Sequence, residues 1–344
     1  MKKTLIRAFS LVLILALMLM SVGCSSAPAQ ELVIFSWADY IDPELLAQFT
    51  EETGIAINYN YYTSNEEMLT KLEAAEGGDY DIVIGSDFVV NIARNEGLIM
   101  EIDKEKVPNF SNLNPAYLNH YFDPEAKYTV PYVAGTPLIV YDPAKVTCEI
   151  TGYNSLWDPS LADQLVVMDD MRNVIGMTLK SMGYSLNTED PEIIAQAGEK
   201  LLQLKPNIRA LDGDTPHEKL ISGECTIGYL TMAENNPDLA FYLPEEGTNI
   251  YVDAMCIPKG AANKANAESF INFMCDPEVS AKASVFTQYI NCNSAATEYL
   301  PQEFLDNKAV NIPADTLGET EFMQDISAEA TEQMNEIWNA FKQA

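Results

Sequence analysis

The sequence predicts an α/β protein built as two lobes that are joined by a hinge. Short apolar segments alternate with amphipathic helical segments along most of the chain, which is typical of α/β folds. The 344 residues are enough for two lobes, each with its own hydrophobic core. Although the net charge is −31, apolar residues make up 47% of the chain, so a folded protein is expected.

Residues 1–23 have the pattern of a bacterial secretory signal. Three basic residues and no acid accompany the apolar run 11–20, which is too short for a comfortable membrane span. The sequence Ser21-Val22-Gly23-Cys24 resembles a lipobox, in which Cys24 becomes the lipidated first residue after cleavage. Residues 24–30 then form a flexible tether. An ordinary cleaved signal that leaves Cys24 free is the alternative.

Residues 31–136 are expected to begin lobe 1. A strand at 32–35 precedes a helix that Asp42-Pro43-Glu44 starts and Gly54 ends. Strands at 55–61 and 81–84 flank a helix that the capping box 64–67 opens, and residues 85–87 turn into a further helix. Strands that alternate with helices at this spacing predict a parallel sheet with right-handed crossovers.

The chain is expected to cross to lobe 2 near 131–141 and to return along the strand 250–257. Lobe 2 would comprise 137–255 and 299–344, and lobe 1 would be completed by 256–298. The expected elements are strands at 165–168 and 226–230 and helices at 173–182, 193–204, 263–274 and 277–286. Apolar residues from Ile326 to Phe341 follow helical spacing, so we expect Trp338 to pack in a core.

Cysteine and histidine usage gives little support to catalysis or metal binding. After Cys24 the cysteines are Cys148, Cys225, Cys256, Cys275 and Cys292, an odd number without metal-site spacing. We expect buried free thiols, although one disulfide stays possible. Neither His120 nor His217 lies in a metal-ligand pattern, and no nucleophile elbow, Walker loop or dinucleotide-binding glycine motif occurs. We therefore expect no enzyme, no metal and no cofactor.

The excess of acid, 51 Asp and Glu against 20 Lys and Arg, narrows the class of ligand. Nucleic acid and anionic lipid surfaces need clustered basic residues, so neither is an expected partner. The negative field would instead attract cations. Acidity that serves only solubility is the alternative.

Acidic and aromatic residues recur at the strand ends, where ligands bind in open α/β sheets. The candidates are Trp37, Asp39, Tyr40, Ser86, Phe88, Asp170, Asn173, Tyr229, Thr231, Tyr251 and Asp253. Carboxylates would pair with a desolvated ammonium, and aromatic faces would attract it through cation–π contacts. A sugar site has a similar composition, but basic residues are scarce here, Arg172 being the nearest, which favours an aliphatic polycation.

Several stretches of the chain resemble the spermidine/putrescine-binding proteins of bacterial polyamine ABC importers. They are FSWADYI (35–41), EETGI (51–55), YDIVIGS (80–86), FSNLNP (110–115), DDMRNV (169–174) and VDAMCIP (252–258). The resemblance covers residues 31–344 and implies a two-lobe type II periplasmic-binding fold. Together with the lipobox at Cys24, it leads us to expect a lipid-anchored, extracytoplasmic receptor, a monomer, that captures a polyamine and delivers it to an ABC transporter permease. Another solute, or a polyamine sensor for a membrane signalling protein, are the alternatives.

The resemblance also implies individual roles. Trp37 and Tyr40 would line the amine cleft, with Tyr251 as an aromatic wall. Asp39, Asp170 and Asp253 would be the acids that meet ammonium groups, Ser86 would be a polar contact, and Gln324 would match a glutamine near the family's C-terminus. The sequence departs from the family at Asn173, which replaces an acid, at Tyr229 and Thr231, where Trp is frequent, and at Ala38 and Phe88. These departures bear on which polyamine is bound.

Three candidates also have purely structural explanations. Asp39 and Asp170 could each cap the helix that follows, and Trp37 could be a core aromatic. Asp253 is harder to explain in this way, because an unpaired acid inside an apolar strand is costly to bury.

Overall fold

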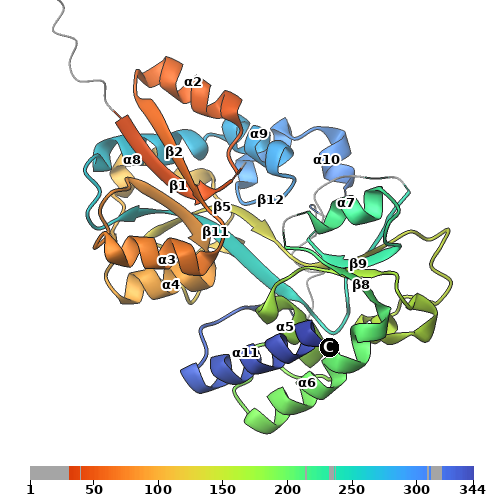
Figure 1. The fold of residues 1–344 in the computed structure, drawn as a ribbon. Coiled ribbons are helices and arrows are strands. Elements are labelled where there is room, and N and C mark those ends of the chain that lie inside the picture. The colour runs from red at the N-terminus through yellow and green to blue at the C-terminus, as the bar shows by residue number, and fades with distance from the viewer. Residues whose placement is uncertain are drawn as a thin grey trace, which may run out of the picture.

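The computed structural model describes residues 31–344 apart from 39, 214, 232–235, 237, 308–309 and 311–319. The expected signal 1–23, the tether 24–30, the lipidation site Cys24 and Asp39 therefore lie outside the described residues. The described strands form two sheets, which are the bases of two lobes (Figure 1). Lobe 1 is the larger sheet with the helices that cover it, and lobe 2 is the smaller sheet with its own helices.

Lobe 1 contains a mixed sheet in the order β12-β5-β11-β3-β1-β2, with β4 and β13 paired to β11. Its strands are β1 (Glu31–Trp37), β2 (Ala56–Tyr62), β3 (Ile82–Ser86), β4 (Ile99–Met100), β5 (Thr129–Gly135), β11 (Asn249–Pro258), β12 (Ile290–Asn291) and β13 (Glu321–Phe322). The expected parallel pairing is confirmed for β1 with β2 and β3. β11 runs antiparallel to both β3 and β5, because the chain re-enters this sheet from lobe 2.

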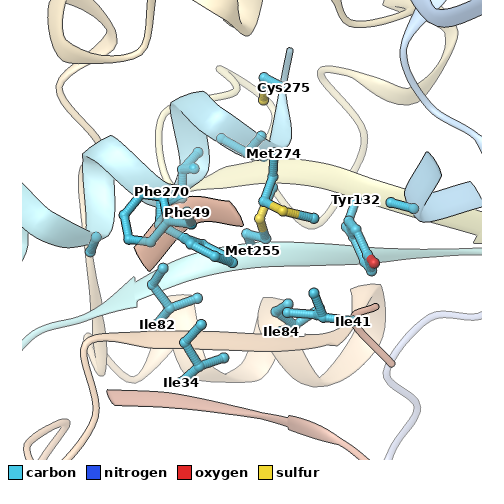
Figure 2. Packing of buried hydrophobic residues seen from close by; sticks show 14 of the residues in the cluster. Ile34, Ile41, Phe49, Ile82, Ile84, Tyr132, Met255, Phe270, Met274 and Cys275 are labelled. Atoms are coloured by element: carbon cyan, nitrogen blue, oxygen red, sulfur yellow. The ribbon is translucent and has the colours of Figure 1, made fainter. Parts of the chain in front are cut away.

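Helices cover both faces of the large sheet. They are α2 (Pro43–Thr53), α3 (Asn65–Ala74), α4 (Asp87–Asn95), α8 (Lys264–Met274) and α9 (Pro277–Thr287). Alternate strand residues point to opposite faces: Ile34 packs with α2 and α8, whereas Phe35 packs with α3 and α4. In Figure 2 the rings of Phe49 and Phe270 meet beside Ile82 and Met255, and the two centroids are 5.0 Å apart.

Lobe 2 contains a sheet in the order β10-β6-β9-β7-β8. Its elements are β6 (Leu138–Tyr141), β7 (Leu165–Val167), α5 (Met171–Lys180), α6 (Pro191–Leu204), β8 (Ile208–Leu211), α7 (Pro216–Ile221), β9 (Ile227–Leu230), β10 (Ala240–Tyr242), α10 (Gln302–Asp306) and α11 (Ala328–Gln343). Helices α5, α6 and α11 gather on one side of this lobe (Figure 1). Trp338 on α11 is buried in their common core, as the helical spacing predicted.

The helix boundaries follow from the capping residues. The Asp42 carboxylate accepts a hydrogen bond from the Glu44 amide at 2.8 Å, and Gly54 ends α2 with a φ of +73°. Ser64 caps α3 through the Glu67 amide. The sequence placed the start of α5 at 173, but the helix begins at Met171 because Asp170 is its cap.

Two adjacent segments carry the chain between the lobes, one from β5 to β6 and the other from β10 to β11 (Figure 1). They are joined side by side: the Thr136 hydroxyl donates to the Asn249 carbonyl at 2.8 Å, and Thr248 donates to the Pro137 carbonyl at 3.0 Å. The division of the chain into lobes stays a prediction. Because β11 pairs with β5 from Tyr251 onward, the pairing favours a second crossing just before 249, in place of 255.

Two further expectations concern cysteines and membrane insertion. The five described cysteines are free thiols, four of them buried and Cys148 half-buried, as the sequence predicted. Among the described helices, none combines the length and the apolar composition that crossing a bilayer requires.

Candidate ligand-binding site

Asp253 is a buried carboxylate in the middle of β11. It is 4% exposed and lies between β5 and β3, where it is paired with Ser86. The Tyr40 hydroxyl donates to Asp253 Oδ2, and no ion pair joins Asp253 to a basic side chain in the described part of the chain. Burial raises the pKa of Asp253, against the opposing effect of hydrogen bonding to Tyr40 and Ser86. An ammonium group bound beside this carboxylate would stabilise its ionised form.

Tyrosine rings surround this carboxylate. The Tyr40 ring lies 5.9 Å from the ring of Tyr289 and 5.6 Å from that of Tyr132, both in edge-to-face geometry. The Tyr251 ring lies 6.3 Å from Tyr289. Burial raises the pKa of both Tyr40 and Tyr251, so these phenols are neutral and present intact π faces. Neutral rings around a carboxylate suit an organic cation.

Tyr251 also reaches the other lobe. Its hydroxyl donates to Thr231 Oγ1 at 3.3 Å, and Thr231 directly follows β9 of lobe 2. The ring fits because Gly135 is its partner on β5: a Cβ atom at position 135 would overlap the Tyr251 phenol. Thr231 and Tyr251 thus form a contact between the lobes, beside the Asp253 carboxylate.

Asp170 and Asn173 lie on the facing edge of lobe 2. Asp170 is exposed, and its Oδ1 accepts from the Asn173 amide at 2.8 Å, so it caps α5 as its structural alternative proposed. This cap uses one of the acceptor positions that a carboxylate offers. The Asn173 side chain accepts from Asn249 Nδ2 at 3.2 Å, which joins lobe 2 to the start of β11.

β11 connects these two groups of residues. Asn249, Tyr251 and Asp253 are alternate residues of one strand, so their side chains share a face. The three positions span about 13 Å at the usual rise of a strand. One face of β11 therefore carries contacts to Asn173, Thr231 and Tyr40, from both lobes.

The other aromatic candidates, Trp37, Phe88 and Tyr229, pack mainly against other protein side chains. The Trp37 ring lies 4.5 Å from Tyr62, and its carbonyl accepts from Tyr59 at 2.6 Å. Phe88 packs against the core under α3 and α4, and Tyr229 is buried in the lobe 2 core, 5.6 Å from the Tyr153 ring. Each of these aromatics is held chiefly by protein neighbours.

Ser86 and Gln324 have polar surroundings. Ser86 Oγ accepts from Asn65 Nδ2 at 3.3 Å, at the start of α4. Gln324 is exposed and joins lobe 2 through its backbone, because its carbonyl accepts from Arg172 at 3.1 Å and its amide donates to Asn187 at 2.8 Å. Ser86 thus lies beside Asp253, whereas Gln324 lies on the Arg172 side.

The sequence interpretation missed two residues near Asp253. Tyr289 follows α9, where no local pattern marks it, and only its ring contacts with Tyr40 and Tyr251 reveal it. Asp87 was placed at a strand end and at the start of a helix but was not chosen as a candidate contact, yet it is fully buried. Its Oδ2 accepts from the Val252 amide at 3.2 Å, and burial strongly raises its pKa. The signal for Asp87 was its position directly after a strand.

Metal binding has no support in the described ranges, where no group of three or more His, Cys, Asp or Glu side chains is arranged to hold an ion.

Comparisons with known proteins agree with this geometry. Residues 44–312 match the family described as bacterial extracellular solute-binding protein. The spermidine/putrescine-binding periplasmic protein of Salmonella typhimurium is 37% identical over 317 residues, which are 89% of this chain and 91% of that protein.

Two solved structures share the fold. The spermidine/putrescine ABC transporter substrate-binding protein PotD of Streptococcus pneumoniae is 36% identical, with a TM-score of 0.82 over 91% of this chain and 99% of that one. The Tp0655 (TpPotD) lipoprotein of Treponema pallidum is 28% identical, with a TM-score of 0.81 and the same coverage. The expected two-lobe type II periplasmic-binding fold with a hinge is thus confirmed, and the chain belongs to the bacterial extracellular solute-binding protein family.

Proposed function

We propose that this protein captures an aliphatic polyamine, spermidine or putrescine, between its lobes and delivers it to an ABC importer. The observation that carries the proposal is Asp253, a buried carboxylate without a described cationic partner, surrounded by neutral tyrosine rings. An ammonium supplies the missing charge, and the rings pack against methylene groups. Relatives that are called spermidine/putrescine-binding proteins support the same ligand class.

Within this proposal, β11 is the floor along which the ligand lies. One ammonium pairs with Asp253 between Tyr40 and Tyr251, with Ser86 as a polar neighbour. Towards lobe 2 the ligand meets Asn173, Thr231 and Asp170. Trp37, Asp39, Phe88, Tyr229 and Gln324 stay candidate contacts, which the binding of a ligand would test.

The proposal extends to the setting of the protein. After cleavage, a lipid on Cys24 holds the N-terminus at the outer face of a membrane. One relative, the Tp0655 protein of Treponema pallidum, is named as a lipoprotein, which supports this anchor. It acts as a monomer that presents its ligand to a permease, and it binds without chemical conversion. The net charge is −31 for the whole sequence and becomes more negative when the three basic residues of the signal are removed, which speeds the encounter with polycations.

A ligand screen tests the function directly. The chain without residues 1–23 is expected to gain several degrees in melting temperature with spermidine or putrescine, and no shift with neutral sugars or acidic amino acids. Calorimetry should then give a Kd that weakens as NaCl is raised. A shift with a sugar but not with a polyamine would refute the ligand class. Binding without polyamine uptake in cells that hold the matching permease would favour a sensor.

A further inference from the structure

A small hollow lies at the lobe 2 end of the face of β11 that carries Asp253. Its lining includes Arg172 and Asn173 of α5, Asn249 at the start of β11, and Met323. Asn249 and Asp253 share one face of the strand and are about 13 Å apart at the usual rise per residue. A ligand that lies along β11 with one end at Asp253 therefore brings its other end to this hollow, provided that it is long enough.

Arg172 and Asn249 each have a buried polar atom without a hydrogen-bond partner among the described residues. In Arg172 it is the Nε–H donor, and in Asn249 it is the Oδ1 acceptor. Other contacts hold both side chains in place: Arg172 Nη2 donates to the Gln324 carbonyl at 3.1 Å, and Asn249 Nδ2 donates to Asn173 Oδ1 at 3.2 Å. Because a buried polar atom without a partner is costly, each of the two atoms favours a ligand group that pairs with it.

The charges around the hollow disfavour a second ammonium group. Arg172 and Lys180 are cations that line it, and no Asp or Glu of the described ranges does so. Lys180 is already neutralised by an ion pair of 2.8 Å. Asp170 and Asp325 also act on the Arg172 guanidinium, but both are exposed, so water and salt screen them. The end group that fits here is therefore polar and uncharged.

A secondary amide would pair with both of the unpartnered atoms. Its carbonyl oxygen accepts from Arg172 Nε, and its N–H donates to Asn249 Oδ1. An ammonium only donates and a carboxylate only accepts, so either of them would leave one of the two atoms unpaired. Asn173, which stands where the family has an acid, adds no charge that would attract an ammonium to this end.

We propose that this hollow is a subsite for a neutral acylamino group, so that the protein binds mono-acylated polyamines with their free ammonium at Asp253. The inference rests on the proposed function, because it needs the ammonium site at Asp253. It adds a ligand class to that function. N-acetylputrescine is the simplest member of the class, since it has one ammonium, a chain of methylene groups and one secondary amide.

The size of the hollow sets one condition on this binding. In this structure the hollow does not admit a water molecule, so solvent cannot pair with the two atoms there, and an acyl group must displace one wall. Met323 is the wall that yields, because an unbranched thioether side chain adapts to new packing at low cost. It is 5% exposed, so the acyl group would take the place of a buried side chain.

Calorimetry on the chain without residues 1–23 compares each amine with the form that is acetylated on one terminal nitrogen. The pairs are putrescine with N-acetylputrescine and spermidine with N-acetylspermidine. In a site built for two ammonium groups, acetylation removes a charge pair and weakens Kd about 30-fold or more. Here we expect a change of less than about tenfold in at least one pair, because two new hydrogen bonds offset the lost charge.

Two variants test the assignment of the subsite through the ratio of the two Kd values, which a general loss of stability would not move. Asn173→Asp restores an acid and keeps the acceptor for Asn249, so it should favour the parent amine by about tenfold or more. Asn249→Leu removes the Oδ1 acceptor and should disfavour the acetylated form about two- to tenfold, the range of one hydrogen bond. Asn58→Asp is the matched control, since Asn58 is exposed on β2 at the edge of the lobe 1 sheet.

Several results would overturn the inference and leave the proposed function standing. They are a loss of more than about tenfold on acetylation in both pairs, tighter binding of γ-aminobutyrate than of N-acetylputrescine, which would assign the hollow to an anion, and equal ratios in Asn173→Asp and Asn58→Asp. If the acetylated amines alone bind, the inference stands and the unmodified polyamine is refuted as the ligand. If neither form binds, the ammonium site at Asp253 fails, and both proposals fail with it.

Discussion

Replacing Asp253 with asparagine separates ligand binding from folding. The substitution keeps the shape of the side chain and one acceptor for the Tyr40 hydroxyl, and it removes only the charge. In water-excluded surroundings, loss of one partner of a charge pair costs about 2–4 kcal/mol, which weakens Kd roughly 30- to 700-fold. We expect a loss of affinity of this size because Asp253 is 4% exposed, so solvent does not screen its charge.

The stability of the ligand-free protein should move the other way. The folded pKa of Asp253 is raised above its unfolded value, so ionising it destabilises the fold as pH rises through that raised pKa. Asp253→Asn should therefore melt at the same temperature as the wild type or higher, and this part of the pH dependence should vanish. Conversely, the affinity of the wild type for an ammonium should rise with pH over the same range, because only the ionised carboxylate pairs with it.

Titration calorimetry with putrescine and spermidine measures the binding, and thermal unfolding measures the stability. Glu52→Gln is the matched control, since it removes one acidic charge from the exposed surface of α2. If Asp253→Asn binds within threefold of Glu52→Gln while both proteins fold, the assignment of Asp253 as the principal ammonium partner is refuted. A large loss of stability in Asp253→Asn would instead assign the carboxyl a structural role.

Three further predictions follow from individual contacts. Asp170→Ser removes the charge but keeps a cap on α5, and it should weaken polyamine binding several-fold at an unchanged urea midpoint. Asp170→Ala removes the cap as well, so it should also lose about 1 kcal/mol of stability. Equal stability in the two variants would contradict the role of Asp170 as a cap. Lys180→Met should cost about 1–3 kcal/mol in urea unfolding, because it leaves Glu321 without its cation, and Lys180→Met with Glu321→Leu should recover part of it; no recovery would argue against the pair. Burial raises the pKa of Cys256 and Cys275 to about 12, so neither should react with Ellman's reagent at pH 8 until the protein unfolds, and rapid labelling of the native chain would disprove this.

Local signals in the sequence predicted most elements of the fold. Asp42 and Gly54 fix the ends of α2 through backbone geometry that involves only near neighbours, so a linear pattern contains the information. The insertion of β11 between β3 and β5 depends on pairing partners far away in the chain. Nothing local states which strands will meet, and the mixed character of the large sheet was therefore missed.

The candidate site shows the same division. Asp253 was predictable because a carboxylate inside an apolar strand contradicts its surroundings. Tyr229 was chosen for its place at a strand end, but β9 is buried along its whole length, so its ring packs inside lobe 2. Tyr289 could not be predicted, since only the folded chain brings it to Tyr40.

The Tyr251 ring lies where a side chain at position 135 would otherwise be. The position of this ring therefore depends on two residues, Tyr251 itself and the glycine at 135 that leaves space for it. A side chain at 135 would overlap the hydroxyl end of Tyr251, so the ring would have to shift. A redesign of this site for another ligand would therefore have to treat Gly135 and Tyr251 as a pair.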